Sequence, residues 1–141
     1  MIEYIINDSS KKIDHSIIKR IGENLETENN KLNIELNFIS REEIRKLNLK
    51  YLKKNKPTDV LSFNSTGDVI VGQIFICYDI AVEQAKEYNW TLENEVALLV
   101  IHGTLHILGW DHENMNDARK MIEKENEILN TLNLKEYDAE A

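Results

Sequence analysis

The sequence has a single cysteine, a single proline and no apolar run that approaches the roughly 18 residues needed to cross a bilayer. Cys77 has no partner for an internal disulfide, which suits a reducing compartment. The first residues lack the charged-then-apolar order of a signal peptide, and we find no repeat, low-complexity tract or linker. These absences argue against disulfide-stapled, membrane-spanning and repeat proteins. They predict one domain over residues 1–141, located in the cytoplasm.

Positive charge is also scarce, because 17 Lys and Arg residues against 25 Asp and Glu residues leave a net charge of −8. It is nevertheless concentrated in residues 41–56, which carry seven of the basic residues and only two acids. Such a basic segment on an acidic body can meet a phosphate backbone locally while the rest of the surface repels nonspecific contact. The same pattern is also typical of a solvated, lysine-rich helix end.

Hydrophobic periodicity predicts short strands and helices in mixed order. Strands are expected at 3–7, 31–40 and 60–63, and residues 69–78 are expected to form a strand or hairpin buried on both faces. Helices are expected at 10–29, 41–51, 79–88, from 91 through the histidine-rich segment, and at 114–132. Because strands and helices do not alternate strictly, we predict an α+β fold, a small mixed β-sheet of about four strands covered by about five helices.

Polar residues at the expected helix starts predict how the helices begin. Ser9 or Ser10 can cap the first helix, and Ser40 opens a capping box for the second. Asp79 and Thr91 are expected to cap the next two helices.

Three of the four histidines lie in the stretch IHGTLHILGWDH, residues 101–112, which is otherwise mostly apolar. His102 and His106 are four residues apart and therefore lie one turn apart on one helix face. Their neighbours make this helix apolar nearly all round, which is typical of a buried helix. Gly109 can end the helix with a left-handed turn that lets the chain double back, so that His112 can face the pair.

The spacing His-x-x-x-His-x-x-Gly-x-x-His predicts a zinc site at the end of this buried helix. Three neutral imidazole nitrogens suit a tetrahedral Zn²⁺ and leave the fourth position for water, as a catalytic site requires. We therefore expect one Zn²⁺ per chain on His102, His106 and His112, with a zinc-bound water as the reactive group. The alternative is that these histidines are hydrogen-bonded core residues, as a single histidine on an apolar face usually is.

Two neighbours of the histidines bear on the chemistry. Asp111 is a candidate for orienting a ligand imidazole through its other ring nitrogen, although it can equally cap the final helix. Gly103 occupies the position at which the long zinc-peptidase motif carries its glutamate general base. Because glycine cannot take a proton, the pattern argues against a glutamate-based peptidase while it keeps the zinc scaffold.

The stretch HGTLHILGWDH resembles the signature His-Gly-x-Leu-His-x-x-Gly-Tyr-Asp-His of the YbeY family, the ribosomal RNA maturation endoribonucleases. PTDVLSF, at 57–63, is similar to the second block of that family. GQIFI and the later EQA, at 72–76 and 83–85, resemble its Gly-Asp-Ile-x-Ile block and the Gln-Ala that follows. The similarity covers about residues 47–113, with the blocks in the family's order and at its distances.

The resemblance implies a single zinc ion held by His102, His106 and His112. It also implies an endoribonuclease directed at single-stranded RNA. Such an enzyme acts in maturation of the 3′ end of 16S ribosomal RNA and in ribosome quality control, in the bacterial cytoplasm. The ribosome or small-subunit proteins are then the expected partners, and no membrane partner is expected.

The chain departs from the family pattern at four positions. Leu52 stands where an arginine thought to contact RNA is usual, and Gln73 stands where aspartate is usual. Asn64 replaces a frequent proline, and Trp110 replaces a tyrosine. The role of the missing arginine must therefore fall to other residues if RNA binds in the same place.

Lysines of the basic segment are the candidates for that role, although a lysine lacks the two-pronged phosphate grip of arginine. Unstacked bases can lie on aromatic rings, for which Tyr51 and Trp110 are candidates, whereas Phe63 is expected in the core. The expected RNA-binding residues are Lys50, Lys53, Lys54 and Lys56.

Three functions are compatible with these features. The one that they favour is a metal-dependent endoribonuclease. The second is a zinc hydrolase of another substrate class, with an amide or ester bond as its target. The third is a non-catalytic ribosome-assembly factor that a structural zinc ion stabilises.

Overall fold

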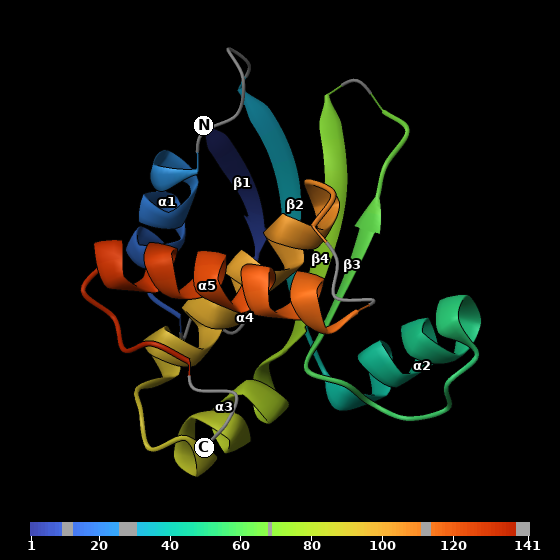
Figure 1. Ribbon diagram of the computed structural model, residues 1–141. Helices are drawn as coiled ribbons and strands as arrows, with labels where there is room; N and C mark the ends of the chain where they lie inside the picture. Colours follow the sequence, from blue (N-terminus) through green and yellow to red (C-terminus); the bar gives the residue numbers. More distant parts are fainter. Residues whose placement is uncertain (10–12, 26–30, 68, 111–113, 138–141) are drawn as a thin grey trace.

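The computed structural model describes residues 1–9, 13–25, 31–67, 69–110 and 114–137. Within these residues it contains four strands and five helices (Figure 1). The strands are β1 (Ile2–Asn7), β2 (Leu32–Ile39), β3 (Val60–Asn64) and β4 (Ile70–Cys77). The helices are α1 (His15–Asn24), α2 (Arg41–Leu52), α3 (Tyr78–Glu87), α4 (Leu92–Ile107) and α5 (Met115–Thr131).

The four strands form one mixed sheet in the order β1-β2-β4-β3. β1 pairs with β2 and β2 with β4 in parallel, whereas β3 runs antiparallel to β4 at the edge. The predicted α+β class, with a small mixed sheet, is therefore confirmed. The residues of β2 alternate as expected, since Ile34, Leu36 and Phe38 are buried while their neighbours are only partly covered.

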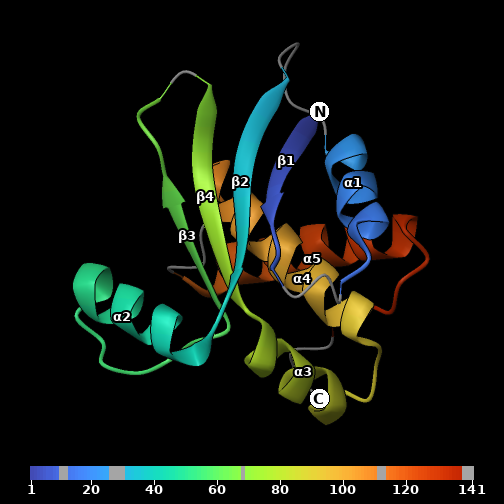
Figure 2. The same ribbon diagram turned by 180° about the vertical axis from the view of Figure 1, so that it is seen from behind.

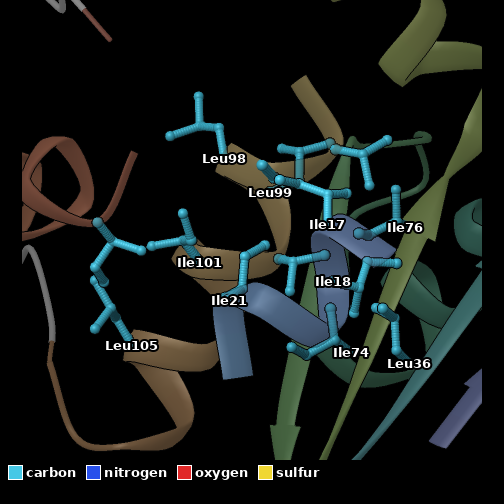
Figure 3. Packing of buried hydrophobic residues seen from close by; sticks show 14 of the residues in the cluster. Ile17, Ile18, Ile21, Leu36, Ile74, Ile76, Leu98, Leu99, Ile101 and Leu105 are labelled. Carbon is cyan, nitrogen blue, oxygen red and sulfur yellow. The ribbon is translucent and has the colours of Figure 1, made fainter. Parts of the chain in front are cut away.

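Helix α4 lies across one face of the sheet, between the strands and α5 (Figure 1). Figure 3 shows its side chains Leu98, Leu99, Ile101 and Leu105 among those of β4 and α1 in the main core. Because α4 also contacts α1 and α3, it needs apolar residues on nearly every side, as its sequence shows. Among the described residues, no helix combines the length and the apolar character that a bilayer crossing requires.

The opposite face of the sheet is covered only in part by helices. α2 packs there through Ile44 and Leu47 against Leu61, Phe75 and neighbouring residues. Seen from behind, α2 lies beside the lower end of β3, and β1 and β2 face the viewer with no helix in front of them (Figure 2). The basic segment therefore belongs to an element at the side of the sheet, whereas the histidines belong to the central helix.

Several predicted boundaries are wrong in informative ways. The first helix covers residues 15–24, not 10–29 as predicted. Its N-cap is Asp14, whose side chain accepts a hydrogen bond from the backbone N–H of Ser16. Ser9 precedes the helix by several residues, and Ser10 lies outside the described residues. Periodicity alone extended the helix because it does not show which of several capping residues the chain uses.

Residues 69–78 form one strand, β4, and not a hairpin. Only one face of it is fully buried, because Gln73 and Phe75, which alternate with the buried Ile74 and Ile76, are only partly covered. α3 begins at Tyr78 without a side-chain cap, so the predicted cap at Asp79 is wrong. The chain passes directly from strand to helix there, which leaves Asp79 in the first turn.

The other predicted helix starts are confirmed. Ser40 and Glu43 form the capping box of α2, with both reciprocal hydrogen bonds present. The Thr91 side chain accepts the backbone N–H of Asn94 and caps α4. The cap thereby defines where the helix that carries the histidines begins.

Candidate metal centre

His102 and His106 lie in the last two turns of α4, where their rings meet edge to face with centroids 4.7 Å apart. Their Nε2 atoms are 3.2 Å apart. Both side chains are partly exposed, although the rest of this part of the helix is buried. The predicted pairing of the two histidines on one helix face is therefore present in the structure.

The carboxylate of Glu125, on α5, holds the other ring nitrogen of His102. Its Oε1 atom lies 2.7 Å from Nδ1 of His102, and the residue is only 3% exposed. Because a carboxylate accepts a hydrogen bond, this contact assigns the proton of a neutral imidazole to Nδ1 and the lone pair to Nε2. His102 is thereby oriented to offer Nε2 to a cation.

Glu125 is a site residue that the sequence analysis missed. The sequence could have revealed Glu125 through its spacing, because it lies four residues after Met121 and four before Leu129, both buried on the apolar face of α5. A buried carboxylate at such a position needs a partner. The sequence did not identify that partner because it lies on another helix.

The separation of the two Nε2 atoms fits a shared zinc ion. With zinc–nitrogen bonds of about 2.0–2.1 Å and tetrahedral angles, two ligand nitrogens stand about 3.3–3.4 Å apart. The observed 3.2 Å is close to that value. His102 and His106 thus have the donor type and the spacing that a zinc ion requires of two of its ligands.

The end of α4 turns back as the sequence predicted. Gly109 has φ of 99°, a left-handed conformation that residues with a side chain rarely adopt. The backbone N–H of Trp110 donates to the carbonyl of Leu105, and that of Gly109 donates to His106, which together form a Schellman cap. Asn64, at the family's frequent proline position, donates from Nδ2 to the Ile107 carbonyl at 3.1 Å.

The third predicted ligand cannot be placed in this way. His112 and the candidate Asp111 lie outside the described residues, so both remain predictions. Within the ranges that the structure describes, no group of three or more His, Cys, Asp or Glu side chains is arranged to hold a metal ion.

Gly103 packs directly against the sheet. A Cβ atom at this position would lie 3.1–3.2 Å from three side-chain atoms of Ile74 on β4. The position at which a zinc peptidase carries its general base is therefore occupied by the contact between α4 and the sheet. No carboxylate can reach the histidines from there.

A cavity of about 300 Å³ lies between α4, α5 and α3 and includes His102 and Glu125 in its wall. Glu95, in the first turn of α4, also lines it and is only 1% exposed. Burial, and next the charge of Asp59, raise the pKa of Glu95 to about 7, although the Trp90 indole N–H opposes the rise. This second carboxylate was likewise not identified from the sequence.

Residues 3–133 of the chain match the family described as Endoribonuclease YbeY. The chain belongs to the YbeY family of endoribonucleases. It is 39% identical over 135 residues to Endoribonuclease YbeY of Prochlorococcus marinus, with 90% of this chain and 73% of the relative covered. Against Endoribonuclease YbeY of Malacoplasma penetrans the identity is 35% over 140 residues, with 92% and 93% covered.

The fold agrees with this assignment. A solution structure of a Thermotoga maritima protein superimposes with a TM-score of 0.63 at 28% sequence identity, and covers 94% of this chain and 92% of the other. As a YbeY endoribonuclease the chain is a hydrolase that acts on RNA, so the family predicted from the sequence motifs is confirmed.

Gln73 and Leu52, two of the four residues that depart from the motif pattern, lie on elements other than α4. Gln73 is on the sheet face opposite α4, and its Nε2 atom is 3.5 Å from Oε1 of Glu35. Leu52, at the usual arginine position, ends α2 and is 49% exposed. Leu52 is therefore a surface residue and not part of the core.

The four candidate RNA-binding lysines are all exposed, on α2 and the loop that follows it. The ammonium group of Lys50 lies 5.1 Å from the ring centroid of Tyr51, which is itself 53% exposed. Phe63 is only partly buried, against the expectation of a core position, and packs on the α2 cluster with the ring centroids of Tyr51 and Phe75 5.1 and 6.0 Å away. Positive charge and an open aromatic ring thus occur together on this YbeY surface.

Proposed function

We propose that this chain is a zinc-dependent endoribonuclease that cuts single-stranded RNA at a metal held by His102, His106 and His112. One observation carries the proposal: the two Nε2 atoms of the helix pair are 3.2 Å apart, and a buried carboxylate fixes the tautomer of His102. Glu125 engages only Nδ1 of His102, and at 3.2 Å the two Nε2 atoms can hydrogen-bond to each other directly. A zinc ion would replace that contact with a bond to each nitrogen.

Different residues of the chain have different proposed roles at this site. Glu125 holds Nδ1 of His102 and so keeps its ring in one orientation. The turn at Gly109 redirects the backbone toward the segment that contains His112, the third proposed ligand. Asp111 is proposed to orient one of the ligand imidazoles. A zinc ion bound there supplies Lewis-acid activation of water or of a phosphate oxygen.

The RNA backbone is proposed to follow the basic segment. Lysine ammonium groups attract phosphates and release counterions when RNA binds, and Tyr51 offers a face on which a base can stack. The supporting observations are that Lys50, Lys53, Lys54 and Lys56 are all exposed and that the Lys50 ammonium group lies 5.1 Å from the centroid of the Tyr51 ring.

The cellular role proposed here follows from the family. We propose that the substrate is 16S ribosomal RNA near its 3′ end and that the protein also serves ribosome quality control. The ribosome or small-subunit proteins would then be its partners, in the cytoplasm. The whole chain, residues 1–141, is proposed to act as one endoribonuclease domain.

Metal analysis combined with a cleavage assay tests the proposal. The purified full chain should contain about one zinc ion per chain, cut single-stranded RNA, and lose that activity when a chelator is added. His106→Ala should abolish both zinc binding and cleavage. His15→Ala is the matched control, because His15 lies on α1, where its Nε2 atom is 3.3 Å from Oδ2 of Asp8, and should leave both unchanged.

Other results would select a different function. Cleavage of amide or ester substrates but not of RNA would indicate a hydrolase of another class. Zinc binding without cleavage, together with normal ribosomal RNA processing in a strain that produces folded His106→Ala protein, would indicate a zinc-stabilised assembly factor. RNA cleavage that survives complete removal of the metal would contradict the zinc-dependent mechanism.

A further inference from the structure

The cavity beside His102 contains a polar group whose burial the metal centre does not explain. Glu95 lines the cavity and is 99% buried, and its Oε2 atom accepts no well-formed hydrogen bond among the described residues. The buried Trp90 Nε1, whose indole N–H lies near enough to lower the pKa of Glu95, makes none either. A buried carboxylate oxygen without a partner is costly, so such groups are usually retained for a role. The simplest role is to accept a hydrogen bond from a ligand that enters the cavity.

The rest of the lining indicates what that ligand is. Asp59 lies in the wall and is fixed by hydrogen bonds from the Val60 backbone N–H and the Thr58 hydroxyl to its Oδ1 atom. Two carboxylates repel a phosphate group and attract a group rich in hydrogen-bond donors. The ligand is therefore uncharged or positive at this end.

The other walls suit a flat ring. Tyr88 and Tyr137 line the cavity and pack on each other edge to face, with centroids 5.8 Å apart and an interplanar angle of 83°, so a base could stack on the face of one ring at a time. Leu99 and Met121 add apolar surface. Aromatic and apolar side chains of this kind hold nucleobases that have left a stack. A volume of about 300 Å³ is small for a ligand site and suits a single ring system better than a longer chain.

We propose that this cavity is a nucleobase subsite, which receives the base of a nucleotide next to the cleaved bond and prefers guanine through Glu95 and Asp59. This proposal rests on the endoribonuclease function proposed above. Guanine carries two adjacent donors, N1–H and the N2 amino group, which one carboxylate can accept together. Uracil instead presents two carbonyl oxygens beside its single N–H, and those oxygens would face the carboxylates.

The position of the cavity connects base recognition with the metal centre. Glu95 and His102 are seven residues apart on α4, two turns along one face and about 10 Å in rise. A nucleotide whose phosphate lies at the histidines can therefore direct its base along α4 toward Glu95. The acidic lining keeps phosphates out of the cavity, while the histidine end of the same helix is the part proposed to attract them.

Binding of nucleosides tests the subsite without depending on catalysis. In NMR titrations of the full chain, guanosine should shift the amide signals of Glu95, Leu99 and Ala118, and uridine should shift them far less. Glu95→Gln should weaken guanosine binding about tenfold, the discrimination expected when a two-donor contact is lost. Glu93→Gln is the matched control, because Glu93 is exposed in the same helical turn. Ala118→Leu narrows the cavity from α5 and should weaken guanosine binding with Glu95 intact.

Mapping of cleavage sites tests the same subsite in the reaction. On single-stranded RNA of random sequence, guanine should be enriched about tenfold over uracil at one position beside the cut, and Glu95→Gln should reduce that ratio to about two. Substitution of inosine, which lacks the N2 amino group, should lower cleavage at that position. Cutting without base preference, or equal shifts by guanosine and uridine, would overturn the subsite and leave the nuclease intact. Guanosine binding in a protein that never cuts RNA would support the subsite and reject the proposed activity.

Discussion

Nδ1 of His102 lies 2.7 Å from Oε1 of Glu125, a residue of α5 that is almost fully buried. The contact ties the metal-binding end of α4 to the helix that packs across it. It also leaves Nε2 of His102 beside Nε2 of His106, where one ion can bind both. Carboxylate–histidine pairs of this kind set both the orientation and the basicity of metal ligands.

Glu125 therefore should control metal affinity without touching the metal. Glu125→Ala is expected to lower zinc affinity about 10- to 100-fold, and Glu125→Gln, whose amide oxygen can still accept from Nδ1, should lower it less. Competition with a chromophoric chelator measures this affinity. Glu127→Gln, two residues away and exposed in a pair with Lys124, is the control. Equal affinities in the Glu125→Ala and wild-type proteins would show that the pair has no positioning role.

Gly103 should resist substitution for reasons of packing. Gly103→Ala places a methyl group 3.1–3.2 Å from the Ile74 side chain, which must move or separate α4 from the sheet. Overpacking of this kind typically lowers the free energy of unfolding by about 1–3 kcal/mol. Urea denaturation measures the loss, with Gly67→Ala as control because its nearest neighbours there are 3.5 Å away. If the free energy of unfolding of Gly103→Ala stayed within about 0.5 kcal/mol of the wild-type value, the Ile74 side chain would be able to move aside at little cost.

Glu95 should make the stability of the protein depend on pH. Its pKa of about 7 in the folded protein lies above the ordinary value of 4.5, so between these values the folded state holds the proton more often than the unfolded state. The free energy of unfolding contributed by this group is then full below about pH 4.5 and is lost as the pH rises through 7, by at most about 3 kcal/mol.

Glu95→Gln removes the ionisable group, and with it the pH-dependent contribution to the free energy of unfolding, but keeps the shape of the side chain. The stability of the variant relative to wild type should therefore increase between pH 5 and pH 8, whereas that of the exposed variant Glu93→Gln should not. Chemical denaturation across this range provides the measurement. A constant difference between Glu95→Gln and wild type would mean that the carboxylate ionises in the fold as it does in the unfolded chain.

The basic segment should determine how RNA binding depends on salt. Each lysine that neutralises a phosphate of single-stranded RNA contributes about 0.7 to the slope of log K against log salt concentration. Replacement of the four candidate lysines by glutamine should thus reduce the slope by up to about 2.8. The control makes the same change at four exposed lysines elsewhere: Lys19, Lys31, Lys86 and Lys135. An equal reduction in both variants would indicate general charge attraction and no specific path.

The parts of the site that the sequence predicted are those governed by local geometry. A spacing of four residues fixes His102 and His106 on one face of α4, and a glycine after the helix makes the left-handed turn at Gly109 possible. The capping box at Ser40 was predictable for the same reason, because its partners lie three residues apart.

The first helix shows where local reasoning fails. Several polar residues before Ile17 can cap a helix, and the choice of Asp14 depends on how α1 packs against β1 and α4. The two buried faces expected for residues 69–78 were wrong for a related reason. An apolar run does not reveal that α2 covers only part of the second face of the sheet.

The sequence alone thus determined the family, the paired histidines on α4 and the absence of a general base at Gly103, since each depends on residue identity or on spacing within one element. Tertiary structure decided that Glu125 orients His102 and that Glu95 lines a cavity beside it. These relationships depend on how α5 crosses α4, and such packing between distant segments follows from the shapes of whole surfaces. The spacing of residues along a chain does not specify it.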